Sequence, residues 1–338
     1  MNAIGIMWIW SWIWIWSFVI RAEIRAEARA EARAPNDANS NAKAKKRPNI
    51  ILFLTDDQDV TAGSIAPSIM PHLHEQFRNG GMEFHRYYVS TGLCCPSRAT
   101  ILRGQYCHNT QVYDNGDLNN ETYQSGGWSK FLDLETETIA TMLQSVGYET
   151  VLIGKYLNGY DLSEKSDAKV HKPLGWDHWM GLLTCFKFYG PIFTNGTDLI
   201  RTSNTVYQTD YMIDWVVDFL TQKRNTNNDK PFFLVVAPFA PHSPATPAKR
   251  HEHLFPNATV PSNDNDAIDP PDNLQRDYPV WIKDMPKLTL SQVDHMNIFY
   301  KNRLRSLQAV DEGLDKLVQT LDDLGLTEST YFFYTSGE

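Results

Sequence analysis

Apolar residues occur along this chain in two kinds of run, short continuous blocks and longer stretches with helical spacing. The blocks at residues 49–55 and 231–237 have the composition of strands buried on both faces of a sheet, and residues 330–335 form a last strand-like block. Residues 148–153 form another such block, directly after Gly147, where a helical pattern ends. These four blocks predict the main strands of a central sheet.

Helical spacing predicts the elements between the strands. Residues 138–146 and 206–223 are amphipathic, and residues 290–324 contain a long helix with Leu304, Leu307, Val310 and Leu314 on one side. Residues from Pro96 onward also look helical, which places residue 94 at a helix N-terminus. Strands that alternate with long helices predict an α/β fold, a three-layer sandwich with a mostly parallel, mixed central sheet.

The N-terminal part has a different composition from the rest. Residues 4–20 are almost entirely apolar, a run that is short for a membrane span and long for a signal-peptide core. No Lys or Arg precedes it, and Ala28-Arg29-Ala30 offers a small-x-small cleavage site. We interpret residues 1–20 as a signal peptide or a signal anchor, so membrane anchoring through residues 4–20 stays open; an unreliable gene start is the alternative.

Residues 21–46 combine an Arg-Ala-Glu repeat with a polar stretch that lacks periodicity, and we interpret them as a low-complexity spacer. The globular domain then covers residues 47–338. The net charge of -9 argues against a nucleic-acid partner, which requires a basic face. Four cysteines in 338 residues do not make a disulfide scaffold.

Two adjacent carboxylates, Asp56 and Asp57, follow the first predicted strand. In parallel sheets functional side chains gather at the carboxyl ends of strands, and hard oxygen ligands suit Ca²⁺ or Mg²⁺. An ordinary loop start is the alternative explanation for this pair.

The most specific motif is Cys-Cys-Pro-Ser-Arg at residues 94–98, followed by Ala-Thr-Ile-Leu-Arg-Gly. It resembles the sulfatase signature, Cys-x-Pro-Ser-Arg followed by Leu-Thr-Gly, with Arg103 where that family usually has Thr. A helix N-terminus at Cys94 favours an anion, and Arg98 lies one turn further on. The alternative is a structural cysteine pair before a helix.

Two more segments are similar to the same family. Gly-Lys-Tyr-Leu-Asn at residues 154–158 supplies Lys155, and Pro-His-Ser-Pro at residues 241–244 supplies His242. Leu157 stands where many members have a histidine. The resemblance extends from about residue 47 to Ser336, and it is strongest to the N-acetylglucosamine-6-sulfatase and arylsulfatase branch.

The resemblance implies an alkaline-phosphatase-like fold and hydrolysis of a sulfate ester of a sugar or an aryl alcohol. Cys94 would be oxidised to formylglycine by a dedicated generating enzyme. Calcium would be held by Asp56, Asp57 and the modified Cys94. Arg98 and Lys155 would bind the sulfate, and His242 would protonate the departing alcohol.

The last predicted strand departs from the family pattern. Thr335-Ser336 is followed by Gly337-Glu338, where the family has Asp-Asn-Gly, so we expect an incomplete calcium shell and a missing C-terminal domain. A sulfoglycan-binding pseudoenzyme and a phosphate or phosphonate ester hydrolase therefore remain as alternatives. Sequons at Asn120, Asn195 and Asn257 permit entry to the secretory pathway, to a secreted, lysosomal or vacuolar, or membrane-anchored location.

Overall fold

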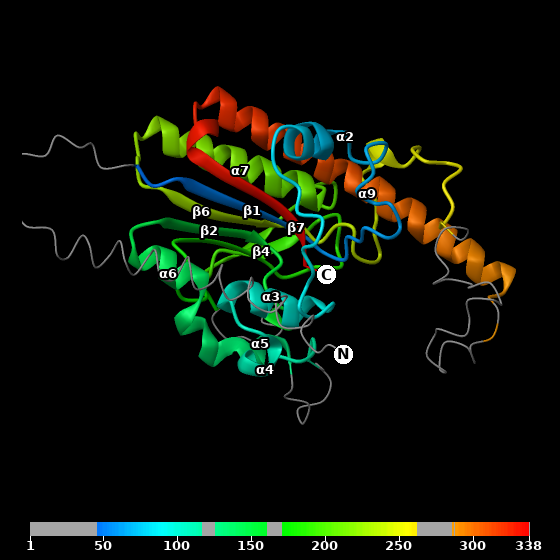
Figure 1. Cartoon of the computed structure of the whole chain (residues 1–338), viewed down its shortest axis with the longest axis horizontal. Coiled ribbons are helices and arrows are strands. Elements are labelled where there is room, and N and C mark those ends of the chain that lie inside the picture. The colour runs from blue at the N-terminus through cyan, green and yellow to red at the C-terminus, as the bar shows by residue number, and fades with distance from the viewer. Residues whose placement is uncertain (1–45, 117–125, 161–170, 262–285, 287, 338) are drawn as a thin grey trace, which may run out of the picture.

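A computed structural model describes residues 46–116, 126–160, 171–261, 286 and 288–337. These residues form a seven-stranded sheet with the strand order β5-β4-β3-β2-β6-β1-β7 (Figure 1). The strands are β1 (Asn49–Thr55), β2 (Glu149–Gly154), β3 (His178–Leu182), β4 (Ile192–Thr194), β5 (Leu199–Arg201), β6 (Phe232–Ala237) and β7 (Thr330–Ser336).

The sheet is mostly parallel. β1 pairs in parallel with β6 and β7, and β2 pairs in parallel with β6 and β3. Only the β3–β4 and β4–β5 pairings of the described residues are antiparallel. This pattern confirms the predicted mixed sheet, in which β1, β2 and β6 lie side by side with their carboxyl ends at one edge.

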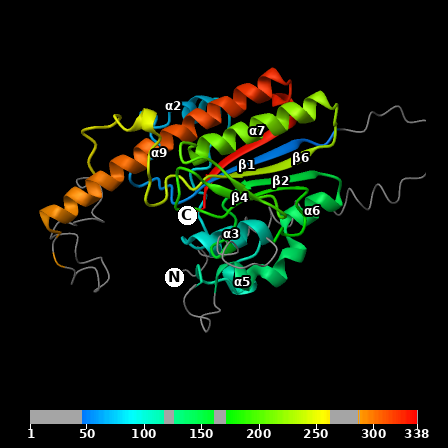
Figure 2. The ribbon, with the colours of Figure 1, turned by 180° about the vertical axis from the view of Figure 1, so that it is seen from behind.

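Helices cover both faces of the sheet, as the two opposite views show (Figures 1 and 2). On one face lie α7 (Gln208–Asn225) and α9 (Leu290–Asp323), and on the other α3 (Cys94–Arg103), α5 (Gly127–Phe131) and α6 (Ile139–Ser145). Each face of the sheet has its own apolar cluster. Successive β1 residues contribute to different clusters, so that Ile51 belongs to one and Leu52 packs against the other. The shorter helical segments are α2 (Pro71–Leu73), η1 (His74–Asn79), α4 (Cys107–Thr110), η2 (Leu132–Glu137), η4 (Lys249–His251) and η6 (Thr327–Ser329).

The predicted elements agree with the structure within two residues at most ends. The four apolar positions predicted for one side of the long helix are all buried in α9: Leu304, Leu307, Val310 and Leu314. The helix predicted from Pro96 onward begins at Cys94 and ends at Arg103, and Gly104 after it has a φ of 60°, the left-handed conformation common after helices. The predictions for residues 1–20 and most of the spacer concern residues outside the described ranges. Among the described helices, none is long and apolar enough to cross a membrane.

Candidate functional site

Three neighbouring strands deliver side chains to one place. Asp56 follows β1, Lys155 follows β2, and the chain after β6 leads to His242. Gly154 permits this arrangement because its φ is 116° and a Cβ there would lie 2.1 Å from the carbonyl oxygen of Ala237. The Lys155 amide then donates to that same carbonyl at 2.8 Å, which fixes the start of the loop.

The fourth element is α3, whose first residue is Cys94. Leu93 in the N-cap position provides no side-chain cap. Instead, the side-chain oxygen of Asn115 accepts a hydrogen bond from the Cys95 amide at 2.9 Å, which satisfies one unpaired donor of the first turn. Burial raises the pKa of the Cys95 thiol to about 12, so this neighbour of Cys94 stays protonated.

A buried ion cluster lies beside Cys94. Lys155 Nζ lies 2.5 Å from one carboxylate oxygen of Asp56, and an Arg98 terminal nitrogen lies 3.3 Å from the other. The exposed fractions of these side chains are 0% for Asp56, 2% for Arg98 and 3% for Lys155. With two positive charges and one negative, the three residues carry a net positive charge inside the protein.

The ionisation of this cluster follows from its partners. Burial alone would raise the pKa of Asp56, but the charges of Arg98 and Lys155 hold it below its ordinary value. Burial alone would lower the pKa of Lys155, but Asp56 keeps it above its ordinary value. Arg98 also donates to the Lys155 carbonyl at 3.0 Å, while its buried Nε has no partner among the described residues. The cluster is therefore fully charged, and it retains one donor for an anion.

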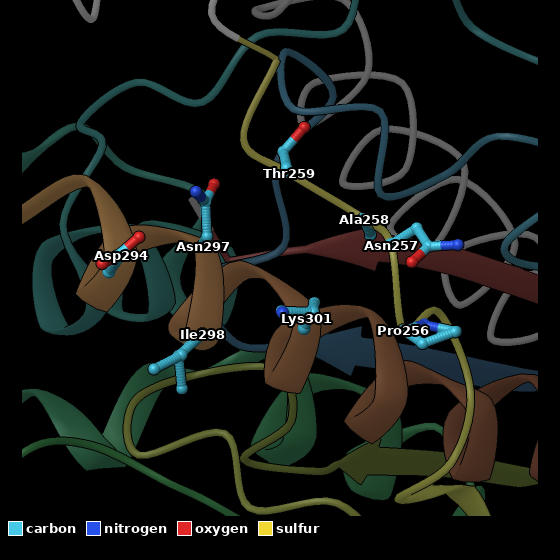
Figure 3. A pocket seen from close by; sticks show the side chains of 8 residues that line it. All are labelled: Pro256, Asn257, Ala258, Thr259, Asp294, Asn297, Ile298 and Lys301. Atoms are coloured by element: carbon cyan, nitrogen blue, oxygen red, sulfur yellow. The ribbon is translucent and has the colours of Figure 1, made fainter. Parts of the chain in front are cut away.

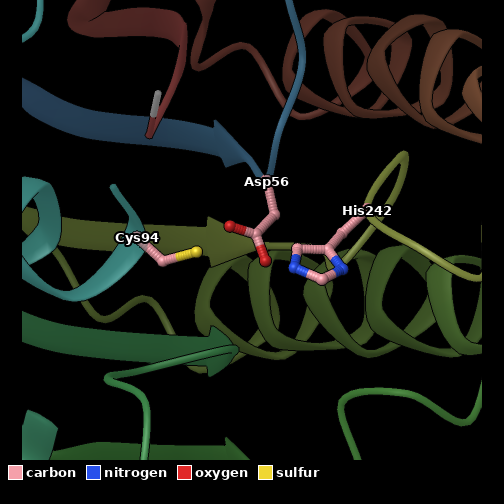
Figure 4. A group of neighbouring side chains, drawn as sticks. All are labelled: Asp56, Cys94 and His242. Atoms are coloured by element: carbon pink, nitrogen blue, oxygen red, sulfur yellow. The ribbon is translucent and has the colours of Figure 1, made fainter. Parts of the chain in front are cut away.

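Cys94 and His242 complete the site. Figure 4 shows the Cys94 sulfur and the His242 ring directed toward the Asp56 carboxylate, and one ligand atom from each residue lies within 4.8 Å of the others. The Nδ1 of His242 donates to the Ser243 carbonyl at 2.8 Å, and its Nε2 lies 3.4 Å from Asp57. Asp57 adopts φ 59°, a left-handed backbone conformation that is uncommon for residues other than glycine.

The ligand atoms of the site can be compared with those that the predicted calcium ion prefers. Asp56 and Asp57 offer the hard oxygens that calcium prefers, whereas the thiol of unmodified Cys94 is a soft ligand. Calcium takes about six to eight oxygens, so these two carboxylates fit as part of a shell. The structure brings His242 into the group that could hold a metal, although the sequence predicted only an acid at this position.

All the residues predicted for the site lie together, with Asp57 at its more exposed rim. The sequence did not indicate three supporting residues, which are Asn115, Phe239 and Gln208. Phe239 stacks on His242 with ring centroids 4.2 Å apart, and Lys155 Nζ lies 5.2 Å from the same ring centroid. The only signal for Phe239 was its position just after a predicted strand.

A separate hollow lies between the start of α9 and the chain before it (Figure 3). None of the residues predicted for the site lines it, and its polar groups are those of exposed loop and helix positions. Its volume is about 320 Å³. Its lining residues are Pro256, Asn257, Ala258, Thr259, Asp294, Asn297, Ile298 and Lys301.

Comparison with known proteins identifies the lineage of this arrangement. The family model for sulfatases matches residues 48–338, nearly all of the predicted globular part. The chain belongs to the sulfatase family. The predicted resemblance is thereby confirmed, and Cys94 to Arg98 are the residues of this chain that match the family signature.

Curated sulfatases align with most of the chain. The N-acetylglucosamine-6-sulfatase of Homo sapiens is 35% identical over 303 residues, which cover 87% of this chain and 52% of the relative. The arylsulfatase of Volvox carteri is 32% identical over 321 residues, 87% of this chain and 47% of the relative. An extracellular sulfatase SULF-1 homolog of Drosophila melanogaster is 34% identical, over 88% of this chain and 25% of its own. The chain spans about half the length of the first two relatives.

Solved structures confirm the fold of this member of the sulfatase family. A protein crystallised with its substrate, D-glucosamine-2-N,6-O-disulfate, has a TM-score of 0.65 and 25% identity, over 86% of this chain and 65% of its own. The phosphonate monoester hydrolase of Agrobacterium radiobacter has a TM-score of 0.52 and 18% identity, over 86% and 62%. The second likeness shows that the same fold also carries phosphonate ester chemistry.

Proposed function

We propose that this sulfatase-family chain hydrolyses a sulfate ester, with the sulfate bound between α3 and the ends of β1 and β2. The observation that carries the proposal is the buried cluster of Asp56, Arg98 and Lys155. A buried net positive charge is costly unless an anion compensates it. A helix N-terminus at Cys94 adds further attraction for an anion at the same place.

The residues divide the chemistry between them. Arg98 and Lys155 bind the sulfate oxygens and stabilise the charge that grows on them in the transition state. His242, whose Nδ1 is held by the Ser243 carbonyl, presents Nε2 to protonate the departing alcohol. Formylglycine made from Cys94 would supply the nucleophilic oxygen as a hydroxyl of its hydrate. Calcium, which Asp56, Asp57 and residue 94 would hold, would supply Lewis acidity.

For the substrate we propose a sulfated sugar of the glucosamine-6-sulfate type. Support comes from the relatives named N-acetylglucosamine-6-sulfatase and from the structural neighbour that holds a glucosamine disulfate. An aryl sulfate would serve as a second, artificial substrate, in line with the arylsulfatase relative.

We also propose maturation in the secretory pathway, with a formylglycine-generating enzyme as the partner that modifies Cys94. The extracellular relative and the predicted signal peptide or anchor in residues 1–20 support this location. Asn195 and Asn257 lie exposed outside helices and strands, where an oligosaccharide can be attached, whereas Asn120 lies outside the described residues.

The test is turnover by the chain produced together with a formylglycine-generating enzyme. Glucosamine-6-sulfate and 4-nitrophenyl sulfate should both release sulfate, and a calcium chelator should lower the rate. Cys94→Ala should abolish turnover, because no nucleophile remains at residue 94. Cys107→Ala is the matched control, since Cys107, like Cys94, is in no disulfide bond among the described residues but lies outside the site. Normal turnover by Cys94→Ala would sink the mechanism.

Assays on the same protein preparation distinguish the proposed function from two alternatives. A phosphate or phosphonate ester hydrolase would cleave 4-nitrophenyl phosphate faster than 4-nitrophenyl sulfate. A binding protein without activity would retain sulfated sugars while showing no calcium-dependent release of sulfate.

A further inference from the structure

Phe186 is an exposed aromatic residue on a fixed backbone. It lies in the connection between β3 and β4 and exposes 62% of its surface, although Cys185 and Phe188 on either side are buried. Single exposed apolar residues are common on protein surfaces, so exposure alone carries no meaning. The position of Phe186 and the way its loop is held distinguish it from such residues.

Gln208 fixes the loop through hydrogen bonds from the protein interior. This first residue of α7 is completely buried, and its side-chain amide nitrogen donates to the carbonyls of Cys185, at 3.3 Å, and Lys187, at 3.0 Å. Its side-chain oxygen accepts from the Phe239 amide at 3.3 Å. One buried side chain therefore ties the loop of Phe186 to the segment after β6, and little conformational freedom remains to be lost when a ligand binds.

The Phe186 ring lies next to His242. Its centroid is 5.7 Å from the His242 ring at 76°, and 5.2 Å from the Phe239 ring at 77°. Phe239 in turn stacks on His242 and lies under Lys155. The aromatic series therefore runs from the buried cation of the sulfate site to the exposed ring of Phe186.

This series follows the path that the substrate must take. The groups proposed for the sulfate are almost completely buried, so the rest of the ester has to extend toward solvent. His242 is the proposed acid for the departing alcohol, and its side chain is 19% exposed. The carbon skeleton of that alcohol begins at the oxygen that His242 protonates. Phe186 is 62% exposed and its ring lies next to that of His242, so it lies near the place where that skeleton begins.

We propose that Phe186 contacts the ring of the alcohol that carries the sulfate ester, and that it contributes to the choice of substrate. The apolar face of a pyranose or the face of an aryl group would pack against the exposed phenyl ring. The proposal rests on the sulfatase activity proposed above. It adds a substrate-contacting residue on the alcohol side, with Gln208 as the residue that positions it.

The experiment compares Phe186→Ala with the unsubstituted chain, using glucosamine-6-sulfate, 4-nitrophenyl sulfate and inorganic sulfate as an inhibitor that has no ring. We expect KM to rise about tenfold for at least one ring-bearing ester, with kcat changed less, because one aromatic contact is lost. Comparing the two esters shows whether Phe186 contacts the sugar ring, the aryl ring or both. Inhibition by sulfate should change less than about twofold.

Two control variants bracket this result. Phe186→Tyr retains an aromatic face and should restore KM to within about twofold of the unsubstituted value. Tyr331→Ala removes a side chain that is also 62% exposed but lies in β7, and it should leave KM unchanged. An unchanged KM for both esters in Phe186→Ala would overturn the proposal, as would an equal weakening of sulfate inhibition, which would indicate general damage to the site.

Failure of the proposed activity is measured separately. If the unsubstituted chain hydrolyses neither ester, that activity is wrong, and binding of glucosamine-6-sulfate to Cys94→Ala then decides about Phe186. Binding about tenfold weaker after adding Phe186→Ala would support the contact. Equal binding, or no binding in either variant, would overturn it.

Discussion

Two carboxylates at opposite ends of the sheet have nearly the same partners. Asp56 follows the end of β1 and pairs with Lys155 and Arg98. Glu149 begins β2 and pairs with Lys223 and His178, at 2.6 and 2.8 Å. In both places the lysine also lies near a phenyl ring, Phe239 in one case and Phe232 in the other.

The two clusters differ in charge and in burial. Asp56 has two permanently charged partners and no exposed surface, so the protein encloses an unbalanced positive charge. Glu149 is 13% exposed and has one permanent cation, while its second partner, His178, is 43% exposed. The Glu149 cluster is balanced and joins β2 to β3 and α7. Similar residues therefore make a structural contact at one end of the sheet and the proposed anion site at the other.

The largest effect on stability should follow from neutralising the two carboxylates. We expect Asp56→Asn to lower the free energy of unfolding by about 3–5 kcal/mol, because two buried cations lose their counter-charge. Glu149→Gln should cost about 2 kcal/mol, since Glu149 is 13% exposed and its partner His178 is 43% exposed. Urea unfolding of both variants at neutral pH measures the difference. A smaller loss for Asp56→Asn than for Glu149→Gln would contradict the comparison.

Affinity for sulfate should distinguish the clusters next. Lys155→Met should weaken the binding of sulfate about tenfold or more, because a charge-assisted hydrogen bond is lost. Lys223→Met should leave it unchanged, because that lysine serves the balanced cluster. Thermal stabilisation by sodium sulfate, measured against sodium chloride of equal ionic strength, provides the readout. Equal losses in both variants would mean that no specific anion site exists.

The pH dependence of stability should come partly from Glu149. The hydrogen bond from His178, followed by that from Lys223, lowers the pKa of Glu149 from 4.5 to about 2. A carboxylate whose pKa is lower in the folded state than in the unfolded state stabilises the protein at pH values above its unfolded pKa. This stabilisation is lost as the pH falls through the folded pKa. The stabilisation should therefore be complete above about pH 5 and disappear between about pH 4.5 and 2.

The check is the free energy of unfolding of the natural chain and of Glu149→Gln across that range. Solvent screening reduces the expected difference to about 2 kcal/mol at neutral pH, and it should shrink toward zero near pH 2. A difference that does not change with pH would show that Glu149 stabilises the fold by packing instead of charge.

The smallest effect should come from the start of α3. Asn115→Ala removes the acceptor of the Cys95 amide and should cost about 1 kcal/mol of unfolding free energy, as for a lost helix cap. Asn115→Asp retains the acceptor and adds a negative charge near the helix N-terminus, so it should cost less. Thermal unfolding of both variants tests this order, and the reverse order would argue against a capping role.

The sequence predicted the features that are local or motif-encoded. The strands β1, β2, β6 and β7 were visible as continuous apolar blocks, although β7 lies at the edge of the sheet and exposes Tyr331 and Phe333. Asp56, Cys94, Lys155 and His242 follow from position at strand or helix ends and from resemblance. β3, β4 and β5 were missed because they are short and interrupted by turns, so no long apolar run marks them. Gln208 and Asn115 were missed because their roles depend on contacts with residues distant in the chain.

The burial of the signature residues also constrains when they can be modified. Cys94, Cys95, Pro96, Ser97 and Arg98 are all buried once α3 has packed against the sheet. An enzyme that has to bind these five residues can reach them only while the chain is still unfolded. Folding and the proposed modification of Cys94 would therefore compete in time, and every molecule that folds first would keep a plain cysteine. The fraction of active protein would then be set by the relative rates of these two processes, and faster folding would lower the yield of mature molecules.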